Sequence, residues 1–190
     1  LQANQNIVFN NAASAKLGSG AAGTYSMVLN SDLDQSTASG GAIQLNTGTL
    51  LGSNGGSITL GGGATPGTAP AIGQGALVEG ILINGAQLQS GTGNIILSGT
   101  GLAGTTNAHG IRIANSGVVQ SSSGSITMTG IGGAGANNDG VLLNANSSIL
   151  SGSGAIQVKG TRTGSGVDIN TTGGGNVIGG ATASASSSDI

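Results

Sequence analysis

Three residues that could take part in acid–base or metal chemistry recur at equal spacing along the sequence. Glu79, His109 and Asp139 each stand immediately before a glycine, and His109 is the only histidine of the chain. If these positions stack on one corner of a repeating structure, the imidazole lies between two carboxylates. Such a column could hold a divalent metal ion or respond to pH. The alternative, which we favour, is a solvated corner where alternating charge avoids like-charge stacking.

A second group of oxygen-bearing side chains occupies alternate positions, as the ligands of calcium-binding loops do. Asn30, Asp32 and Asp34 form this group. The segment lacks a glycine at the sixth position of the loop, and Gly41 stands where a bidentate glutamate is needed at the twelfth. An ordinary polar turn is therefore the preferred interpretation. We predict no resident metal and no cofactor, with calcium at this turn as the alternative.

Few other residues of the chain could take part in catalysis. The remaining acids are Asp168 and Asp189, and the chain has no cysteine. Carbohydrate-active β-helix enzymes use clustered acids along one groove, and only the column described above resembles such a cluster. We therefore predict no catalytic residue and a protein that is not an enzyme. A carbohydrate-active enzyme is the less favoured alternative.

The composition excludes several classes of partner. The chain has 190 residues, of which 40 are glycine, one is Phe and one is Tyr, and its net charge is −2. Four basic residues give no electrostatic footprint for nucleic acid. No stretch approaches the roughly 20 apolar residues that a membrane-spanning helix needs. We therefore expect neither nucleic-acid binding nor membrane insertion.

The elements that must position these residues are short repeats. A pattern of the form apolar-x-apolar-Asn begins near residues 7, 43, 81, 111, 141 and 167. A second alternating segment occurs at 27–29, 58–60, 95–97, 126–128 and 156–158, and a third precedes it at 50–51, 88, 118–119 and 149–150. Three elements that keep one order through successive repeats predict a solenoid of about five to six rungs.

The period within each element identifies the solenoid as a β-helix. Apolar residues alternate at i and i+2, which is the periodicity of a strand with one buried face. Three short strands per rung, each followed by Gly, Asn or Ser, predict an all-β parallel β-helix over residues 1–190 as a single domain. One column of its core is expected to contain Phe9, Leu45, Ile83, Ile113, Leu143 and Ile169.

The asparagine that ends the first element predicts a structural ladder. Stacked side-chain amides can hydrogen-bond along the axis of a parallel structure. The copy that begins at residue 111 has Ala114 at this position, and the neighbouring Asn115 is a candidate to fill the gap. The expected members of the ladder are Asn10, Asn46, Asn84, Asn144 and Asn170.

The Gly- and Thr-rich repeats resemble a known family. The runs GNIILSGTGLAGTTNAHGIRI (93–113) and GSITMTGIGGAGANNDGVLLN (124–144) are similar to the filamentous-haemagglutinin-like, two-partner-secretion adhesins of bacterial surfaces. The similarity is one of style and period over roughly 7–170 and involves no catalytic motif. It implies a right-handed β-helix located outside the cell or on the bacterial surface, and a segment or subunit of a larger assembly.

Two functions follow as the leading expectations. The first is a non-enzymatic structural or adhesive rod that displays loops at the cell surface, with host or cell-surface glycans as candidate partners. The second is a filament subunit that stacks end to end with itself, because the terminal strands of a solenoid present unpaired edges. Neighbouring solenoid segments of the larger assembly would be partners in either case.

Overall fold

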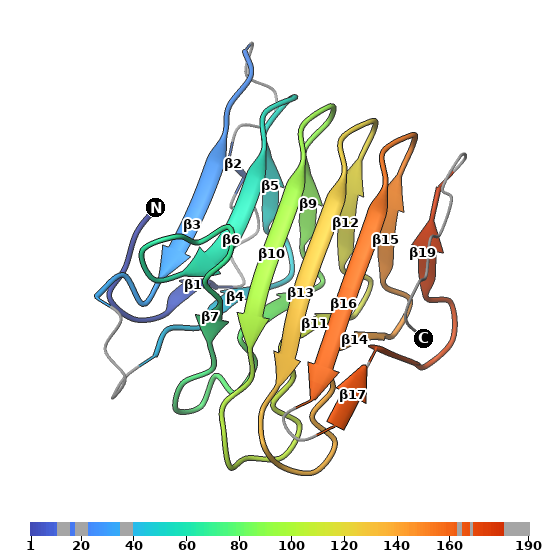
Figure 1. The fold of residues 1–190 in the computed structure, drawn as a ribbon. Helices are drawn as coiled ribbons and strands as arrows, with labels where there is room; N and C mark the ends of the chain where they lie inside the picture. Colours follow the sequence, from blue (N-terminus) through green and yellow to red (C-terminus); the bar gives the residue numbers. More distant parts are fainter. Residues whose placement is uncertain (11–15, 18–22, 35–39, 163–164, 168, 181–190) are drawn as a thin grey trace.

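The computed structural model describes residues 1–10, 16–17, 23–34, 40–162, 165–167 and 169–180. Over these residues the chain contains strands and turns and no helix, and it winds as a parallel β-solenoid with three sheets (Figure 1). The predicted fold class is therefore confirmed. None of the described ranges forms a helix with the length and hydropathy needed to cross a membrane.

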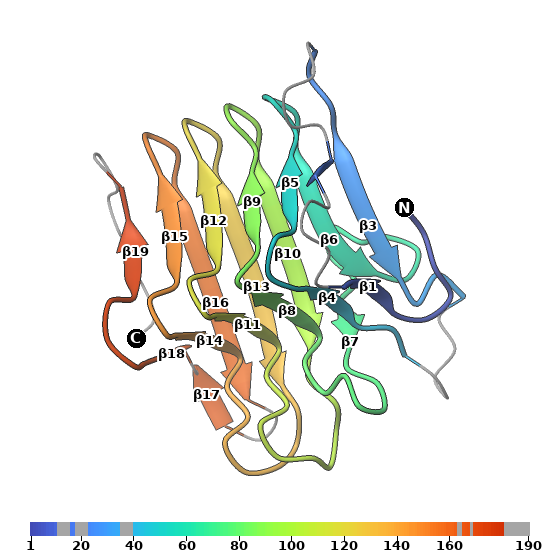
Figure 2. The same cartoon turned by 180° about the vertical axis from the view of Figure 1, so that it is seen from behind.

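Strands from successive rungs pair to form the three sheets. The first sheet contains, in spatial order, β1 (Ile7–Phe9), β4 (Ile43–Leu45), β8 (Ile81–Asn84), β11 (Ile111–Ala114), β14 (Val141–Asn144) and β18 (Ile169–Thr172). The second sheet contains β2 (Lys16–Leu17), β5 (Leu50–Gly52), β9 (Gln87–Gln89), β12 (Val118–Ser121), β15 (Ser148–Ser151) and β19 (Val177–Gly179). Figure 2 shows the first and second sheets from behind.

The third sheet has the longest strands and forms the broad face seen in Figure 1. It contains β3 (Met27–Ser31), β6 (Ile58–Gly62), β10 (Ile95–Thr100), β13 (Ile126–Gly132), β16 (Ile156–Arg162) and β17 (Ser165–Val167). A short strand, β7 (Ala71–Ile72), also pairs with β10. All of these pairs are parallel except β16 with β17.

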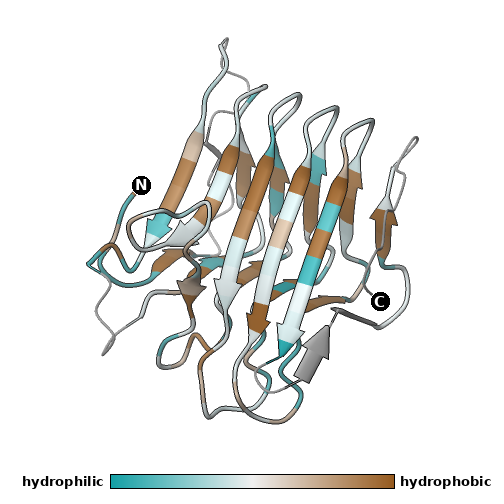
Figure 3. Ribbon diagram, in the orientation of Figure 1, coloured by the Kyte–Doolittle hydropathy of each residue, from teal (hydrophilic) through white to brown (hydrophobic). Residues whose placement is uncertain are grey.

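Aliphatic columns fill the interior of the solenoid. Alternate residues of the central strands point inward, so that Ile126 and Met128 are fully buried while Thr127 between them is partly exposed. The inward-facing column of the second sheet is also inaccessible to solvent. Its members are each 0% exposed: Leu51, Leu88, Val119 and Ile149. Figure 3 shows the apolar residues as bands at matching heights on neighbouring strands. The predicted direction of the side chains is confirmed in these central rungs.

The register of the last rung differs from the prediction. The repeat pattern predicts that Val167 pairs in register with Val141. In the structure, Val141 pairs with Ile169 and Leu142 pairs with Asn170. Val167 instead belongs to β17, which runs antiparallel to β16. A shift of two residues leaves the same set of side chains facing inward, because the side-chain period of a strand is two. Hydrophobic alternation alone therefore could not detect this shift.

Residues 61–79, which precede β8, contain strand residues as well as loops. The first two of these residues end β6, and β7 then resumes pairing with the third sheet. The intervening segment, 63–70, folds against the sheet, and a Cβ atom added to Gly61 would lie 1.9 Å from the carbonyl oxygen of Pro66. This close approach of two backbone segments requires glycine at position 61.

Candidate functional site

Three loops that follow strands of the third sheet stack on one edge of the solenoid. They comprise residues 73–80, 101–110 and 133–140, and they lead back into the first sheet. Backbone hydrogen bonds connect them in order: Leu102 N donates to Val78 O at 2.8 Å, and Gly104 N donates to Ala134 O at 2.8 Å. The loops therefore continue the rungs, and we refer to them as the corner loops.

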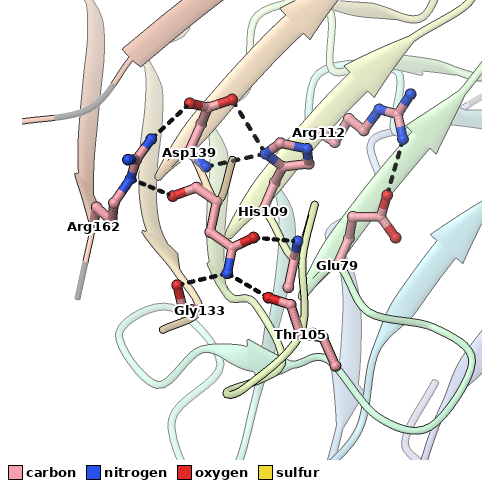
Figure 4. Close-up of polar contacts among 9 residues, drawn as sticks. Glu79, Thr105, His109, Arg112, Gly133, Asp139 and Arg162 are labelled. Carbon is pink, nitrogen blue, oxygen red and sulfur yellow. Dashed lines mark hydrogen bonds and ion pairs between the residues drawn. The ribbon is translucent and has the colours of Figure 1, made fainter. Parts of the chain in front are cut away.

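Asn138 connects two of the corner loops through its side chain. It is fully buried, and its Oδ1 accepts a hydrogen bond from the backbone N–H of Ala108 at 2.8 Å. Its Nδ2 donates to Thr105 O at 2.7 Å and to Gly133 O at 2.8 Å (Figure 4). Sequence reasoning missed this residue. The sequence did contain a signal for it. Asn138 directly precedes Asp139 just as Ala108 directly precedes His109, so the two residues occupy equivalent positions in successive rungs.

His109 and Asp139 lie in contact across two adjacent corner loops. The imidazole is buried, with its side chain 5% exposed, and that of Asp139 is 8% exposed. His109 Nδ1 accepts a hydrogen bond from the backbone N–H of Asp139 at 3.1 Å, and it lies 3.3 Å from Asp139 Oδ2 (Figure 4). The structure thus brings together two of the three residues of the expected column.

Two arginines, from strands of two different sheets, complete this charged corner. Arg112 Nη1 lies 3.1 Å from Glu79 Oε1, so Glu79 pairs with the arginine of β11. Arg162, at the end of β16, lies 3.4 Å from Asp139 Oδ1 and also donates to the carbonyl oxygen of Asn138 at 3.0 Å. The charged corner is defined here as Glu79, His109, Arg112, Asp139 and Arg162.

The two carboxylates of the charged corner lie in separate ion pairs with arginines. Among the described residues, no group of three or more His, Cys, Asp or Glu side chains could hold a metal ion. The sequence contained both arginines, but their partners could be assigned only once the side chains were placed.

The three residues of the expected calcium turn lie in different environments. Asn30 and Asp32 are buried, at 2% and 5% exposed, whereas Asp34 is exposed. The Nδ2 group of Asn30 donates to Gly63 O at 2.9 Å, which ties β3 to the segment before β7. The ordinary polar turn stays the prediction, and calcium binding there stays its alternative.

The amide ladder forms in the central rungs. Asn84 Nδ2 donates to Asn46 Oδ1 at 3.4 Å, and Asn115 Nδ2 donates to Asn84 Oδ1 at 2.6 Å. Asn115 therefore occupies the gap at Ala114. It does so with a φ of 53°, a left-handed conformation that asparagine tolerates better than most residues. Asn46 Nδ2 donates in turn to the backbone oxygen of Phe9 at 3.1 Å.

The ladder does not extend to every expected member. Asn10 is exposed, and the Asn46 amide bonds to the backbone beside it. Asn144 Oδ1 is buried without a hydrogen-bond partner among the described residues. Asn170 pairs with Leu142 in β14, two positions away from the place expected in the column. The register therefore differs from the expected one at this position, and the role of Asn170 in the ladder stays a prediction.

The fold and the corner together define a class of protein, the parallel β-solenoid with three sheets and stacked corner loops. No family model, curated protein or solved structure matches this chain. A functional assignment therefore depends on the architecture and on the charged corner.

Proposed function

We propose that this chain is a non-enzymatic structural and adhesive β-solenoid that acts as a rigid rod and display scaffold on a bacterial cell surface or in an extracellular fibre. The observation that carries the proposal is the in-register stacking of the corner loops along one edge of a continuous aliphatic core. Such a core resists bending, because each rung packs on the next over its whole length. The corner loops then present their tips at fixed spacing.

The state of the charged corner supports a structural role for these residues. Glu79 pairs with Arg112, and Asp139 contacts both His109 and Arg162. Salt bridges that are satisfied within the protein hold loops in place, whereas general acid–base catalysis needs groups that reach a substrate. The exposed part of the edge is formed by small or polar residues at the loop tips, including Thr106 and Ala136.

Adhesion of chain-coated beads to a glycan array and to polysaccharide-coated surfaces tests this proposal. We expect retention on at least one glycan class, and a loss of about tenfold in the loop-tip variants Thr106→Glu and Ala136→Glu, which corresponds to about 1.4 kcal/mol. Gln120→Glu, an exposed change on the second sheet, is the matched control and should bind as the parent does. Absence of retention on every surface, or release of sugars from any polysaccharide, would overturn the proposal.

The alternative function, end-to-end assembly, is supported by the distribution of exposed apolar side chains. Among the described residues, all the large hydrophobic side chains that are exposed, except Ile131, lie near the two ends of the solenoid: Leu1, Val8, Tyr25, Val28, Leu33, Val177 and Ile178. Ile178 is 39% exposed although its register partner Ile149 is fully buried. A second copy stacked on that end would cover such residues.

Sedimentation velocity over a range of protein concentrations tests the alternative. A sedimentation coefficient that rises with concentration in the parent chain, and falls back to one value in Val177→Lys, supports stacking. A single coefficient at all concentrations contradicts it.

A further inference from the structure

His109 makes two contacts with Asp139 that cannot both be hydrogen bonds. The Nδ1 atom lies 3.1 Å from the backbone N–H of Asp139 and 3.3 Å from its Oδ2. An unprotonated Nδ1 has a lone pair, so it accepts from the N–H and has nothing to donate to the carboxylate. A protonated Nδ1 donates to the carboxylate and can no longer accept from the N–H. A single proton therefore selects between the two bonds.

We propose that His109 and Asp139 form a pH-operated switch in the seam between the corner loops 101–110 and 133–140. In its neutral form the imidazole carries its proton on Nε2, and Nδ1 accepts the Asp139 N–H. In acid, Nδ1 takes up a proton and donates it to Asp139 Oδ2, and the Asp139 N–H loses this partner. This inference concerns the seam alone and does not depend on the proposed surface role.

The charged groups around the imidazole favour such an exchange. The Asp139 carboxylate comes from the following corner loop and also contacts Arg162 of β16. Glu79 comes from the preceding corner loop and pairs with Arg112 of β11, on the rung of His109 itself. Asp168 lies outside the described residues. Protonation of His109 thus adds a positive charge to a corner with two carboxylates and two arginines, and Asp139 becomes shared between His109 and Arg162.

The switch is confined to the seam because other bonds hold the loops. Gly110 N donates to Asp139 O at 3.1 Å, and Ile111 N donates to Gly140 O at 3.0 Å. Neither bond involves a titrating group. The adjacent inner residues, Ile111 and Val141, are fully buried aliphatics. We therefore expect acidification to rearrange the corner loops while the three sheets keep their register.

Nitrogen-15 NMR of the full chain tests the switch directly. Because His109 is the only histidine, its ring signals need no assignment. We expect a through-hydrogen-bond 15N–15N coupling between the Asp139 amide and His109 Nδ1 at about pH 8. The coupling should disappear as the imidazole takes up its second proton. Amide signals of 101–110 and 133–140 should move with the same midpoint, and those of β9 and β12 should not.

Three results would overturn the proposal. The first is a proton on Nδ1 already at about pH 8, the second is a coupling that persists after the ring has titrated, and the third is a ring that does not titrate between about pH 4 and 9. His109→Gln is the control for the loop signals. Its side chain can still accept the Asp139 N–H but carries no titrating group, so the pH-dependent movement of 133–140 should vanish.

Two carboxylate variants test whether Asp139, and not Glu79, is the acid that interacts with the protonated imidazole of His109. Asp139→Asn keeps the backbone N–H, so the coupling at high pH should persist, but the negative charge that stabilises the imidazolium is lost. The midpoint should therefore fall by about one pH unit. Glu79→Gln is the matched control, and its midpoint should move by less than half as much, because Glu79 pairs with Arg112. Equal shifts in the two variants would contradict the assignment of Asp139 as the partner.

Discussion

The side-chain oxygen of Asn138 accepts a hydrogen bond from the backbone N–H of Ala108, 30 residues earlier in the chain, at 2.8 Å. The same side chain donates two further bonds to backbone oxygens. Asn138→Ala would leave these three backbone groups without their partner inside the protein. We expect a loss of about 2 to 4 kcal/mol in the free energy of unfolding, measured by urea denaturation.

The neighbouring residue offers a control for this change. Asn137 is exposed and has a φ of 57°. Asn137→Gly suits that conformation, and its effect should stay within about 0.5 kcal/mol. If the two variants unfolded at the same urea concentration, Asn138 would not hold the corner loops together.

Gly61 and Pro66 provide a second test. A Cβ atom at position 61 would lie 1.9 Å from Pro66 O, whereas a Cβ atom at Gly67 would meet nothing within 4 Å. Gly61→Ala should therefore displace segment 63–70 and destabilise the chain by about 1 to 3 kcal/mol. Gly67→Ala should be neutral or slightly stabilising, because alanine restricts the unfolded chain. Thermal denaturation of both variants checks the pair, and an unchanged melting temperature in Gly61→Ala would refute the close approach.

The inward direction of Ile113 predicts a large difference between two substitutions. Ile113 is fully buried and is paired in register with Ile83 and Leu143. Ile113→Asp would bury an unpaired charge, and we expect the central rungs to lose their cooperative unfolding transition in circular dichroism. Thr127 is partly exposed and faces outward. Thr127→Gln, which introduces the residue found at its register partner Gln157, should be nearly silent. Similar behaviour of the two variants would mean that the side-chain directions are reversed.

Because of the amide ladder, we expect Asn84 to contribute more to the stability of the fold than Asn10 does. Asn84 donates to Asn46 and accepts from Asn115, so that Asn84→Ala removes two side-chain hydrogen bonds. We expect a cost of about 1 to 2 kcal/mol in chemical denaturation. Asn10 is exposed, and Asn10→Ala should change the stability by less than about 0.5 kcal/mol. Equal effects would show that the ladder bonds contribute nothing to stability.

Much of the fold could be predicted because a strand has a side-chain period of two. The alternation around Ile126 and Met128 identified both the inner face and the parallel register of β10, β13 and β16. The same period concealed the two-residue shift at Ile169, since a shift by two preserves the inner face. The repeat pattern also could not predict that residues 63–70 fold against the third sheet, because this packing depends on the backbone contact at Gly61.

The candidate site was predicted only in outline. The glycine that follows Glu79, His109 and Asp139 located all three residues on one corner, because glycine marks the start of each rung there. Which side chains touch depends on rotamers and on residues from other strands. Arg112 and Arg162 reach the corner from β11 and β16, and neither stands in a sequence pattern that would have indicated this.

Negative-stain electron microscopy of the purified chain at micromolar concentration tests the central claim most directly. A rod whose rungs stack on one continuous aliphatic core should be seen as short particles of uniform length and width, unchanged by a tenfold increase in concentration. Compact round particles would contradict the solenoid, and long filaments would favour the alternative of end-to-end assembly over the isolated rod.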